Sequence, residues 1–478
     1  MKKTALLALL VAASCSLPPE LLPPPFGPTD AFKGRTRLFY PTGIAVTSGG
    51  AMLIANGNFN HAYDGGTLVS LPASFIGSVF NQTGAAGTRL SCDVAPDPVT
   101  RKPPAGCEQE IPALAPAVMI GNYAGPLALN DAGTIVYTAS RDTGILNAVS
   151  VAGGALSCAS GAGTSATDCR KGMIDLKTAA KLDGPYAIVP GNVLAGGSGG
   201  TQSPVFFVTS VVPHIEGTSS GLLSVSSQIA ALPMGDPSQV AFTMTISPTS
   251  PAATSTGPMV FDPVKRRLYL AGCYERFSGT GAGEPGSGRC SLISSNLLRI
   301  FDVDSQSAAQ VQVYDLYADV LSIDTTQLML ADPDPVTGAF TTLWATMRNP
   351  DILVQIALPT QFSTAPRVRR AVPMPISPAD MIRIPRPGGS DLIGVVSERS
   401  GSIAFYDVGL DQVVGQVEHL GDSPFSVVQV PCPSTGLDFS GSACLATTVF
   451  GECRVAFIEV PLAQPWNALL RGRAGSCP

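Results

Sequence analysis

Five arginines, each with an acid beside or near it, recur along this chain just after short apolar segments. An arginine guanidinium is planar and holds a carboxylate through two parallel hydrogen bonds, so such a set suits the binding of a polar ligand. Two histidines take the same place after two further segments. If the fold brings these positions together, they form a polar rim around one opening. The rim residues are Arg141, Arg276, Arg348, Arg399, Arg454, His61 and His214.

The rim has three interpretations. Each arginine can pair with its neighbouring acid, as Arg141 can with Asp142 and Arg399 with Glu398. Loops are commonly polar in this way, and surface ion pairs contribute little stability. The rim can instead bind an anionic or carbohydrate-like ligand, or a partner protein of the cell envelope. Catalysis is the third interpretation, although no residue is assigned a catalytic role.

Local motifs do not define an active site. Gly196–Gly200 spells G-x-S-x-G, but it lies in a Gly/Ser-rich loop without the strand-to-helix context of a nucleophile elbow. Asn56–Asp64 gathers several oxygen and nitrogen donors and is the one segment worth testing for a metal. Asp332 and Asp334 fit a turn, because the spacing of an EF-hand loop is absent. We therefore predict no metal ligand and no cofactor.

Ten of the eleven cysteines fall into five pairs of near neighbours along the chain. An oxidising compartment permits disulfides, and short loops close when the two Cα atoms approach. We predict pairing between neighbours because the intervening segments are rich in Gly, Pro and Ser, although connectivity near the C-terminus stays open. The predicted pairs are Cys92–Cys107, Cys158–Cys169, Cys273–Cys290, Cys432–Cys444 and Cys453–Cys477.

The remaining cysteine, Cys15, ends a hydrophobic leader. Lys2 and Lys3 precede the apolar run at 4–13, and small residues stand directly before Cys15. That order is typical of a secretory signal. With a cysteine at the cleavage point it resembles a bacterial lipoprotein signal, which implies removal of residues 1–14 and lipidation of Cys15. The alternative is an ordinary signal peptide with an incidental cysteine.

The segment after the leader predicts how the protein is held. Residues 15–33 are Pro-rich and favour an extended tether to a domain over residues 34–478. No other stretch approaches 18 uninterrupted apolar residues, so we expect membrane contact through the lipid alone. In lipoprotein sorting schemes an Asp after the lipidated cysteine favours the inner membrane. Ser16 therefore predicts the outer membrane in a host with two membranes.

Composition narrows the fold class and the partners. Only 13% of residues are charged, while the chain contains 50 Gly and 42 Pro. Low charge with many turn-forming residues favours short strands joined by loops. The net charge of −6 argues against a nucleic-acid partner, since phosphate binding needs a basic face.

One pattern repeats seven times: an apolar strand usually led by Pro, a turn, a second apolar strand, a polar corner and a third strand. The first copy is PTGIAV at 41–46, AMLIAN at 51–56 and GTLVSL at 66–71. The two shortest spacings, from 328 to 378 and from 378 to 424, match one four-stranded propeller blade. The apolar pattern of the fourth strand is weaker, but residues 412–420, just before the copy that starts at 424, match it. The seven copies start at residues 41, 126, 185, 258, 328, 378 and 424.

These copies predict an all-β fold, a seven-bladed β-propeller with disulfide-closed loop insertions, because closing blades into a ring hides most sheet edges. Equivalent corners of radially repeated blades share one face, which places the rim residues together. Two packed β-sandwich domains are the alternative architecture.

The repeats resemble the YVTN-type, lactonase-like seven-bladed β-propellers over about residues 35–465. The resemblance rests on the leading Pro, on turns such as SGGA, NDAG and DPVKR, and on third strands such as IAFYDV. It implies a ring closed by one chain end, for which TRLFY at 36–40 and WNALLRGR at 466–473 are both candidates. Lactonase-like enzymes place acids and other donors in the central channel, but no such residue aligns with this chain.

Two hypotheses of function follow. The first is a non-enzymatic, lipid-anchored binding or scaffold module of the cell envelope. The second is a lactonase-like hydrolase with a metal in the channel. The expected innermost strands are nearly free of acids and His, with Asp262 and Asp380 as exceptions, and Asp262 is placed to start a turn. This pattern favours the binding module.

Overall fold

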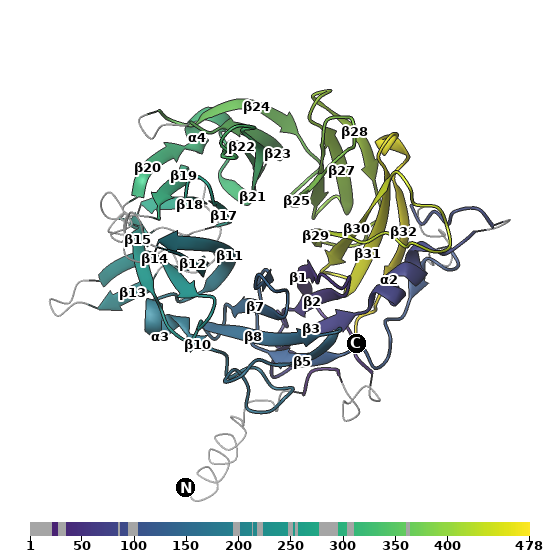
Figure 1. The fold of residues 1–478 in the computed structure, drawn as a ribbon, viewed down its shortest axis with the longest axis horizontal. Coiled ribbons are helices and arrows are strands. Elements are labelled where there is room, and N and C mark those ends of the chain that lie inside the picture. The colour runs from purple at the N-terminus through teal and green to yellow at the C-terminus, as the bar shows by residue number, and fades with distance from the viewer. Residues whose placement is uncertain are drawn as a thin grey trace, which may run out of the picture.

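Seven β-sheets surround a common axis as the blades of a propeller (Figure 1). This computed structural model describes residues 22–26, 35–84, 87–93, 104–194, 201–212, 214–217, 223–246, 252–253, 257–276, 295–303, 310–359 and 364–478. Within each sheet the strands run antiparallel, apart from one added edge strand in the last blade. The predicted all-β, seven-bladed fold is therefore confirmed.

Each blade begins near the axis, and its order of paired strands runs outward from there (Figure 1). Blade one consists of β1 (Pro41–Val46), β2 (Met52–Asn56), β3 (Gly66–Leu71) and β5 (Ala117–Ile120), and blade two of β6 (Ala128–Leu129), β7 (Ile135–Ser140), β8 (Ile145–Ala152), β9 (Ala155–Cys158) and β10 (Ile174–Asp175). Blade three consists of β11 (Pro185–Leu194), β12 (Gln202–Ser210), β13 (His214–Gly217), β14 (Leu223–Pro233) and β15 (Phe242–Ile246). Blade four consists of β16 (Ala252–Ala253), β17 (Met259–Asp262), β18 (Arg267–Arg276), β19 (Ser295–Asp302) and β20 (Gln310–Asp315).

The last three blades include two that are simple four-stranded meanders. Blade five consists of β21 (Asp324–Pro333), β22 (Phe340–Arg348), β23 (Ile352–Ala357) and β24 (Arg367–Pro373). Blade six consists of β25 (Pro378–Ile384), β26 (Leu392–Ser397), β27 (Ser402–Asp407) and β28 (Gln412–Val417). Blade seven consists of β29 (Pro424–Val430), β30 (Ser442–Val449), β31 (Arg454–Pro461), β32 (Leu469–Ala474) and the added strand β4 (Glu108–Gln109). The helices of the described chain are α2 (Ala73–Phe80), α3 (Leu176–Ala180), α4 (Leu316–Val320) and the 3₁₀ turn η2 (Pro465–Asn467).

The hydrophobic core is itself a ring. Strand alternation sends apolar side chains to both faces of every blade, where they meet the neighbouring blade. Seven clusters of buried residues result, one between each pair of adjacent blades in the described chain. Between blades five and six, for example, Trp344 packs against Tyr406 with ring centroids 5.6 Å apart. Because each blade packs on two others, the radial repeat is what buries the core.

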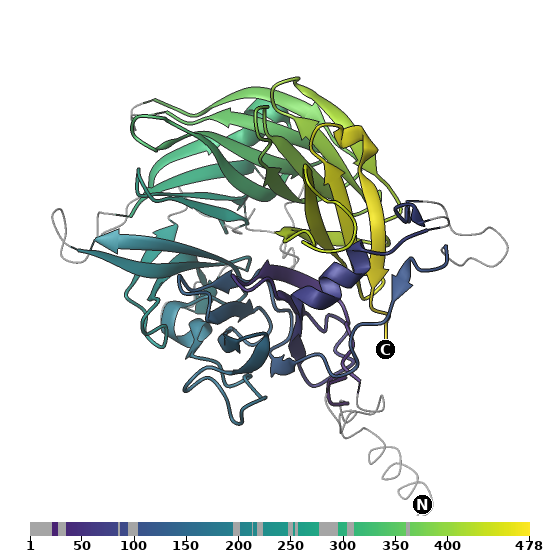
Figure 2. The ribbon, with the colours of Figure 1, turned by 45° about the vertical axis from the view of Figure 1, so that its right-hand side comes forward.

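The ring closes between blades seven and one without an N-terminal strand. Residues 36–40 are not a strand, whereas β32 comes from the other candidate segment and forms the outer edge of blade seven. A long insertion from blade one then crosses to this edge. Helix α2 packs on blade seven, visible against its yellow strands in Figure 2, and β4 adds in parallel beside β32. Blade seven is therefore completed by the C-terminal strand β32 and by the insertion from blade one.

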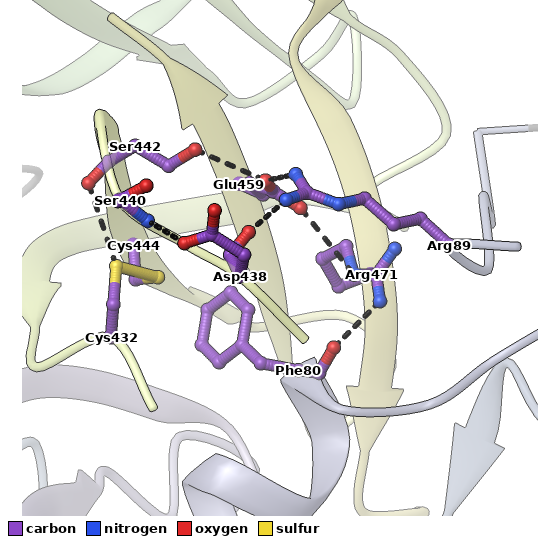
Figure 3. Close-up of a disulfide and its surroundings, with 9 residues drawn as sticks. All are labelled: Phe80, Arg89, Cys432, Asp438, Ser440, Ser442, Cys444, Glu459 and Arg471. Carbon is purple, nitrogen blue, oxygen red and sulfur yellow. Dashed lines mark hydrogen bonds and ion pairs between the residues drawn. A yellow bond between two sulfur atoms is a disulfide. The ribbon is translucent and has the colours of Figure 1, made fainter. Parts of the chain in front are cut away.

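A buried ion cluster fastens this crossing insertion (Figure 3). Arg471 on β32 and Glu459 on β31 are both fully buried, with Nε and Oε2 3.8 Å apart. Arg471 also donates to three carbonyl oxygens of the insertion: those of Phe80 at 2.6 Å, Gln82 at 2.8 Å and Leu90 at 2.7 Å. Arg89 reaches back from the insertion to pair with Glu459. Burial lowers the pKa of Arg471 to about 10, with the positive charge of Arg89 adding to the shift.

Four of the five predicted disulfides are confirmed. Their Cα–Cα distances lie between 4.9 and 5.6 Å, within the range that a disulfide requires. The fifth prediction concerns Cys290 and the side chain of Cys273, which lie outside the described residues. The confirmed pairs are Cys92–Cys107, Cys158–Cys169, Cys432–Cys444 and Cys453–Cys477.

In the part of the chain that the structure describes, no helix has the length and apolar character needed to span a bilayer.

Candidate functional site

The corners between second and third strands lie on the same face of the ring as the segments that enter each innermost strand. This follows because every blade begins at the axis with the same strand direction and then alternates. We call this the corner face. Two clefts on this face span blades five to seven.

The first cleft lies between blades five and six and has a volume of about 280 Å³. Arg348 forms one wall, donating from Nη2 to Glu398 Oε2 at 2.8 Å and from Nε to the Pro378 carbonyl at 3.0 Å. These bonds join the end of β22 to blade six. The cleft is lined by Ile323, Asp324, Arg348, Asn349, Asp351, Ile376, Ser377, Glu398 and Arg399.

The second cleft lies between blades six and seven and has a volume of about 560 Å³. Arg454 pairs with Glu452 at 3.3 Å and with Glu108 of the crossing insertion. Burial lowers the pKa of Arg473, which donates to the carbonyl of Leu420 at 3.2 Å. The cleft is lined by Glu108, Glu398, Arg399, Ser400, Gly401, Glu418, His419, Gly421, Asp422, Glu452, Arg454 and Arg473.

Glu398 and Arg399 line both clefts, so the two form one continuous polar site. Arg399 is exposed, and within the described chain its side chain has no hydrogen-bond or ion-pair partner. The same holds for the exposed carboxylate of Glu418. These two opposite charges are thus available to a ligand, whereas Arg348 and Arg454 are held in place by acids.

Acids outnumber arginines in the joined clefts. Seven carboxylates face four guanidinium groups, which leaves a formal charge of −3 with His419 neutral. This balance disfavours an anionic ligand. It suits an uncharged ligand rich in hydroxyl groups, because a hydroxyl donates to carboxylates and accepts from guanidinium groups.

The other predicted rim residues lie outside the clefts. Half-buried Arg141 follows β7 in blade two, and Arg276 ends β18 in blade four, where its side chain is outside the described residues. His61 is exposed, with Nε2 3.1 Å from the Tyr123 hydroxyl. His214 Nδ1 lies 2.8 Å from Asp183 Oδ2. The structure therefore brings together Arg348, Arg399 and Arg454 at the clefts.

Sequence reasoning from the corners missed half of this site. Asp324, Ser377, Glu418, His419 and Asp422 belong to the segments that enter the innermost strands. Their signal in the sequence is a short polar run just before the strand that starts each repeat. The corners alone therefore showed three of the four arginines, without Arg473 of β32, and only part of the acids.

Asp380 links three blades beside the axis. Its Oδ1 accepts from Gln327 Nε2 of blade five at 2.9 Å and from its neighbour Met381 N at 2.8 Å, while Oδ2 accepts from Val427 N of blade seven at 2.9 Å. Burial raises the pKa of Asp380, and these hydrogen bonds oppose the shift. Asp262, the other exception among the inner strands, accepts from Val264 N and Lys265 N and so caps a turn, as predicted.

Tyr186 lies on β11, the innermost strand of blade three. Burial raises the pKa of its hydroxyl to about 12, and the negative charge of Asp380 adds to the shift. The positive charges of Arg141 and Arg348 act in the opposite direction. Groups from blades two, three, five and six therefore interact electrostatically across the ring.

Replacing Asp380 with Asn should lower the free energy of unfolding by about 1–3 kcal/mol, because the amide NH₂ cannot accept from Val427 N. The folded-state pKa of Asp380 is raised, so the folded state retains its proton longer than the unfolded state. Wild-type stability should therefore fall relative to the Asn variant as pH rises from the unfolded to the folded pKa. Urea unfolding of both proteins at several pH values measures this difference. A difference that grows with pH would contradict the assignment.

The remaining sequence motifs have structural roles or fall outside the described chain. Gly196–Gly200 is not among the described residues. In the segment Asn56–Asp64, buried Asn58 donates to Tyr63 O and to Asn122 Oδ1, each at 2.7 Å. Asp334 accepts from Thr337 N at 2.7 Å within the predicted turn. Among the described residues no three His, Cys, Asp or Glu side chains are grouped to hold a metal ion.

No protein-family model matches the sequence, and no curated protein matches it. Several solved structures are similar in fold. A Lactobacillus plantarum protein is 13% identical, with 79% of this chain and 84% of that chain covered and a TM-score of 0.42. The Myceliophteria thermophila Cps50 (Swd1) β-propeller domain is 9% identical, with 89% and 98% covered and a TM-score of 0.43. A putative 6-phosphogluconolactonase from Bacteroides fragilis is 13% identical, with 81% and 86% covered and a TM-score of 0.41. The fold assignment itself rests on the seven sheets of this chain.

Proposed function

We propose that this chain is a lipid-anchored β-propeller of the bacterial cell envelope that binds an uncharged, carbohydrate-like ligand without catalysing a reaction. The observation that carries the ligand class is the joined cleft over blades five to seven, where both signs of charge line one continuous polar surface. The proposed anchor is the lipid on Cys15, and the order of the leader supports export. Ser16 favours the outer membrane.

The geometry of the cleft supports binding in a specific way. Arg348 and Arg454 are fixed by Glu398, Glu452 and Glu108, so their remaining donors have set directions. A site that is ordered before the ligand arrives loses less entropy on binding. Arg399 and Glu418 complete the set as a donor and an acceptor that face solvent.

A lactonase-like hydrolase would need an acid at the axis that is available to a substrate or a metal. Asp380 is the acid that the structure describes on the innermost strand of blade six, and both of its oxygens accept hydrogen bonds from the protein. That arrangement argues against Asp380 as the acid of a hydrolase, whereas Asp324, which begins the innermost strand β21, lines the first cleft.

Arg399→Ala should weaken binding of a neutral oligosaccharide roughly tenfold, because one charge-assisted hydrogen bond is lost while the fold keeps its contacts. The probe is an array of neutral and acidic oligosaccharides of envelope type, followed by calorimetry on the best binder. Arg369→Ala is the matched control, since Arg369 is exposed on the outer strand β24 away from the clefts. Tighter binding of acidic than of neutral sugars, or an equal loss in the control, would contradict the proposal.

A further inference from the structure

Five aromatic rings gather on the corner face over blades seven, one and two, beside the second cleft. Phe59 is central, with ring centroids 4.5 Å from Tyr123 and 5.0 Å from Phe450. Tyr40 lies 5.1 Å and Phe425 6.5 Å from Phe450. All five side chains are partly exposed, although the described chain buries most of its large apolar residues. We call this set the aromatic patch.

The backbone positions two of these rings at some cost. Tyr40 and Tyr123 precede the innermost strands of blades one and two with φ of 48° and 51°. Glycine or asparagine occupies this left-handed region more readily than a bulky aromatic residue. A tyrosine at both positions therefore indicates a use for the ring beyond turn formation.

The described part of the Pro-rich tether docks beside the aromatic patch. Leu22 forms a parallel bridge with Tyr63, and its carbonyl accepts from Asp64 N at 3.0 Å. Tyr63 and Asp64 belong to the same corner of blade one as Phe59. Leu22 is seven positions after Cys15, so the lipidated cysteine lies at most about 25 Å from this corner. The anchor therefore keeps the corner face close to the bilayer.

We propose that the aromatic patch rests in the headgroup layer of the membrane and sets the orientation of the anchored propeller. Tyrosine favours the boundary between apolar and wet regions, as in membrane-interface belts, and the patch contains Tyr40 and Tyr123 beside three phenylalanines. The lipid supplies the attachment, and the aromatic patch selects which face of the propeller meets the bilayer. This inference rests on the lipid anchor proposed above, but its affinity for lipid can be measured without that anchor.

The ring geometry favours a lipid surface over a sugar as the occupant of the aromatic patch. Phe59 meets Tyr123 at 70° and Phe450 at 83°, so these rings pack edge to face against one another. Ring faces are thereby occupied within the cluster, whereas stacking on a sugar needs a free face. The neighbouring clefts carry net negative charge. The protein should therefore prefer zwitterionic lipid to anionic lipid, because like charges repel.

The test uses the chain from Ser16 onward, exported behind an unrelated cleavable leader, and vesicles of pure phosphatidylcholine in a flotation assay. Ala62 is exposed and follows His61, whose ring lies 5.1 Å from that of Tyr123. Ala62→Trp should raise the vesicle partition coefficient roughly tenfold and Ala62→Asp should lower it, because a buried aromatic side chain is favourable and a charge is not. Adding phosphatidylglycerol to the vesicles should weaken binding of every protein.

Val336 is the matched control. Its side chain is 90% exposed in the turn between β21 and β22, on the face opposite the corners. Val336→Trp and Val336→Asp should leave the partition coefficient within twofold of the parent value. No flotation of the parent chain, or equal effects at both positions, would overturn the membrane orientation and would leave the anchor on Cys15 untouched. Protein capture that depends on Ala62 while vesicle binding does not would assign the patch to a protein partner and also overturn it.

Discussion

Arg471→Ala should lower the free energy of unfolding by about 3–5 kcal/mol, because the change leaves the fully buried carboxylate of Glu459 without its partner on the same sheet. The substitution also removes all three hydrogen bonds to the insertion carbonyls of Phe80, Gln82 and Leu90. Arg89 remains as a partner of Glu459, but it is 35% exposed and arrives from the insertion that Arg471 holds (Figure 3). Urea unfolding of the exported protein measures the loss.

Two further variants separate the buried pair from an ordinary ion pair. Arg370→Ala removes a partner from Asp411 at the protein surface and should cost under about 1 kcal/mol. The double variant Arg471→Met with Glu459→Leu replaces the pair by apolar side chains of similar size. It should recover part of the loss, since no charge stays buried. A single Arg471→Ala variant as stable as the Arg370→Ala variant would show that the insertion does not depend on this cluster.

The repeat pattern predicted the inner strands because they are apolar, short and preceded by Pro. Strands β1, β25 and β29 begin and end where the sequence pattern places them. In blade five the expected start at 328 was wrong, because β21 begins at Asp324. Its first residues, Asp324–Gln327, are polar, and an innermost strand tolerates them where they face the cleft or bond to the next blade, as Gln327 does with Asp380. Hydropathy alone does not show such a strand.

The crossing of the blade-one insertion to blade seven was beyond the sequence pattern for a different reason. Arg471 and the Leu90 carbonyl are 381 residues apart, and the strand that completes blade seven on its outside, β4, has only two residues. A pairing that short carries no periodicity. The buried Arg471 and Arg473 also lie in the segment LLRGRA, whose charges suggest an exposed edge. Only the insertion from blade one turns that edge into an interior.

The candidate site was predicted by residue type better than by charge. Radial symmetry is enough to place three arginines on one face, because each lies at a corner between second and third strands: Arg348 ends β22, Arg399 lies between β26 and β27, and Arg454 begins β31. The negative net charge of the site depends on acids from other segments, among them Glu418 and Asp422 before β29 and Glu108 from blade one. No local pattern connects those residues, so the acidic balance emerges only when the blades are in place.

Cys15→Ser should transfer the protein from the membrane fraction to the soluble fraction, because lipid on this cysteine is the proposed anchor and removal of the thiol removes the attachment point. Labelled palmitate should be incorporated into the parent protein and not into the variant. Ser16→Ala is the matched control at the adjacent position and should keep both the label and the membrane location.

The N-terminal mass of each product is needed, because a serine at the cleavage point can leave the leader uncut and retain the chain through its apolar run at 4–13. Palmitate on the cleaved Cys15→Ser protein would refute the anchor.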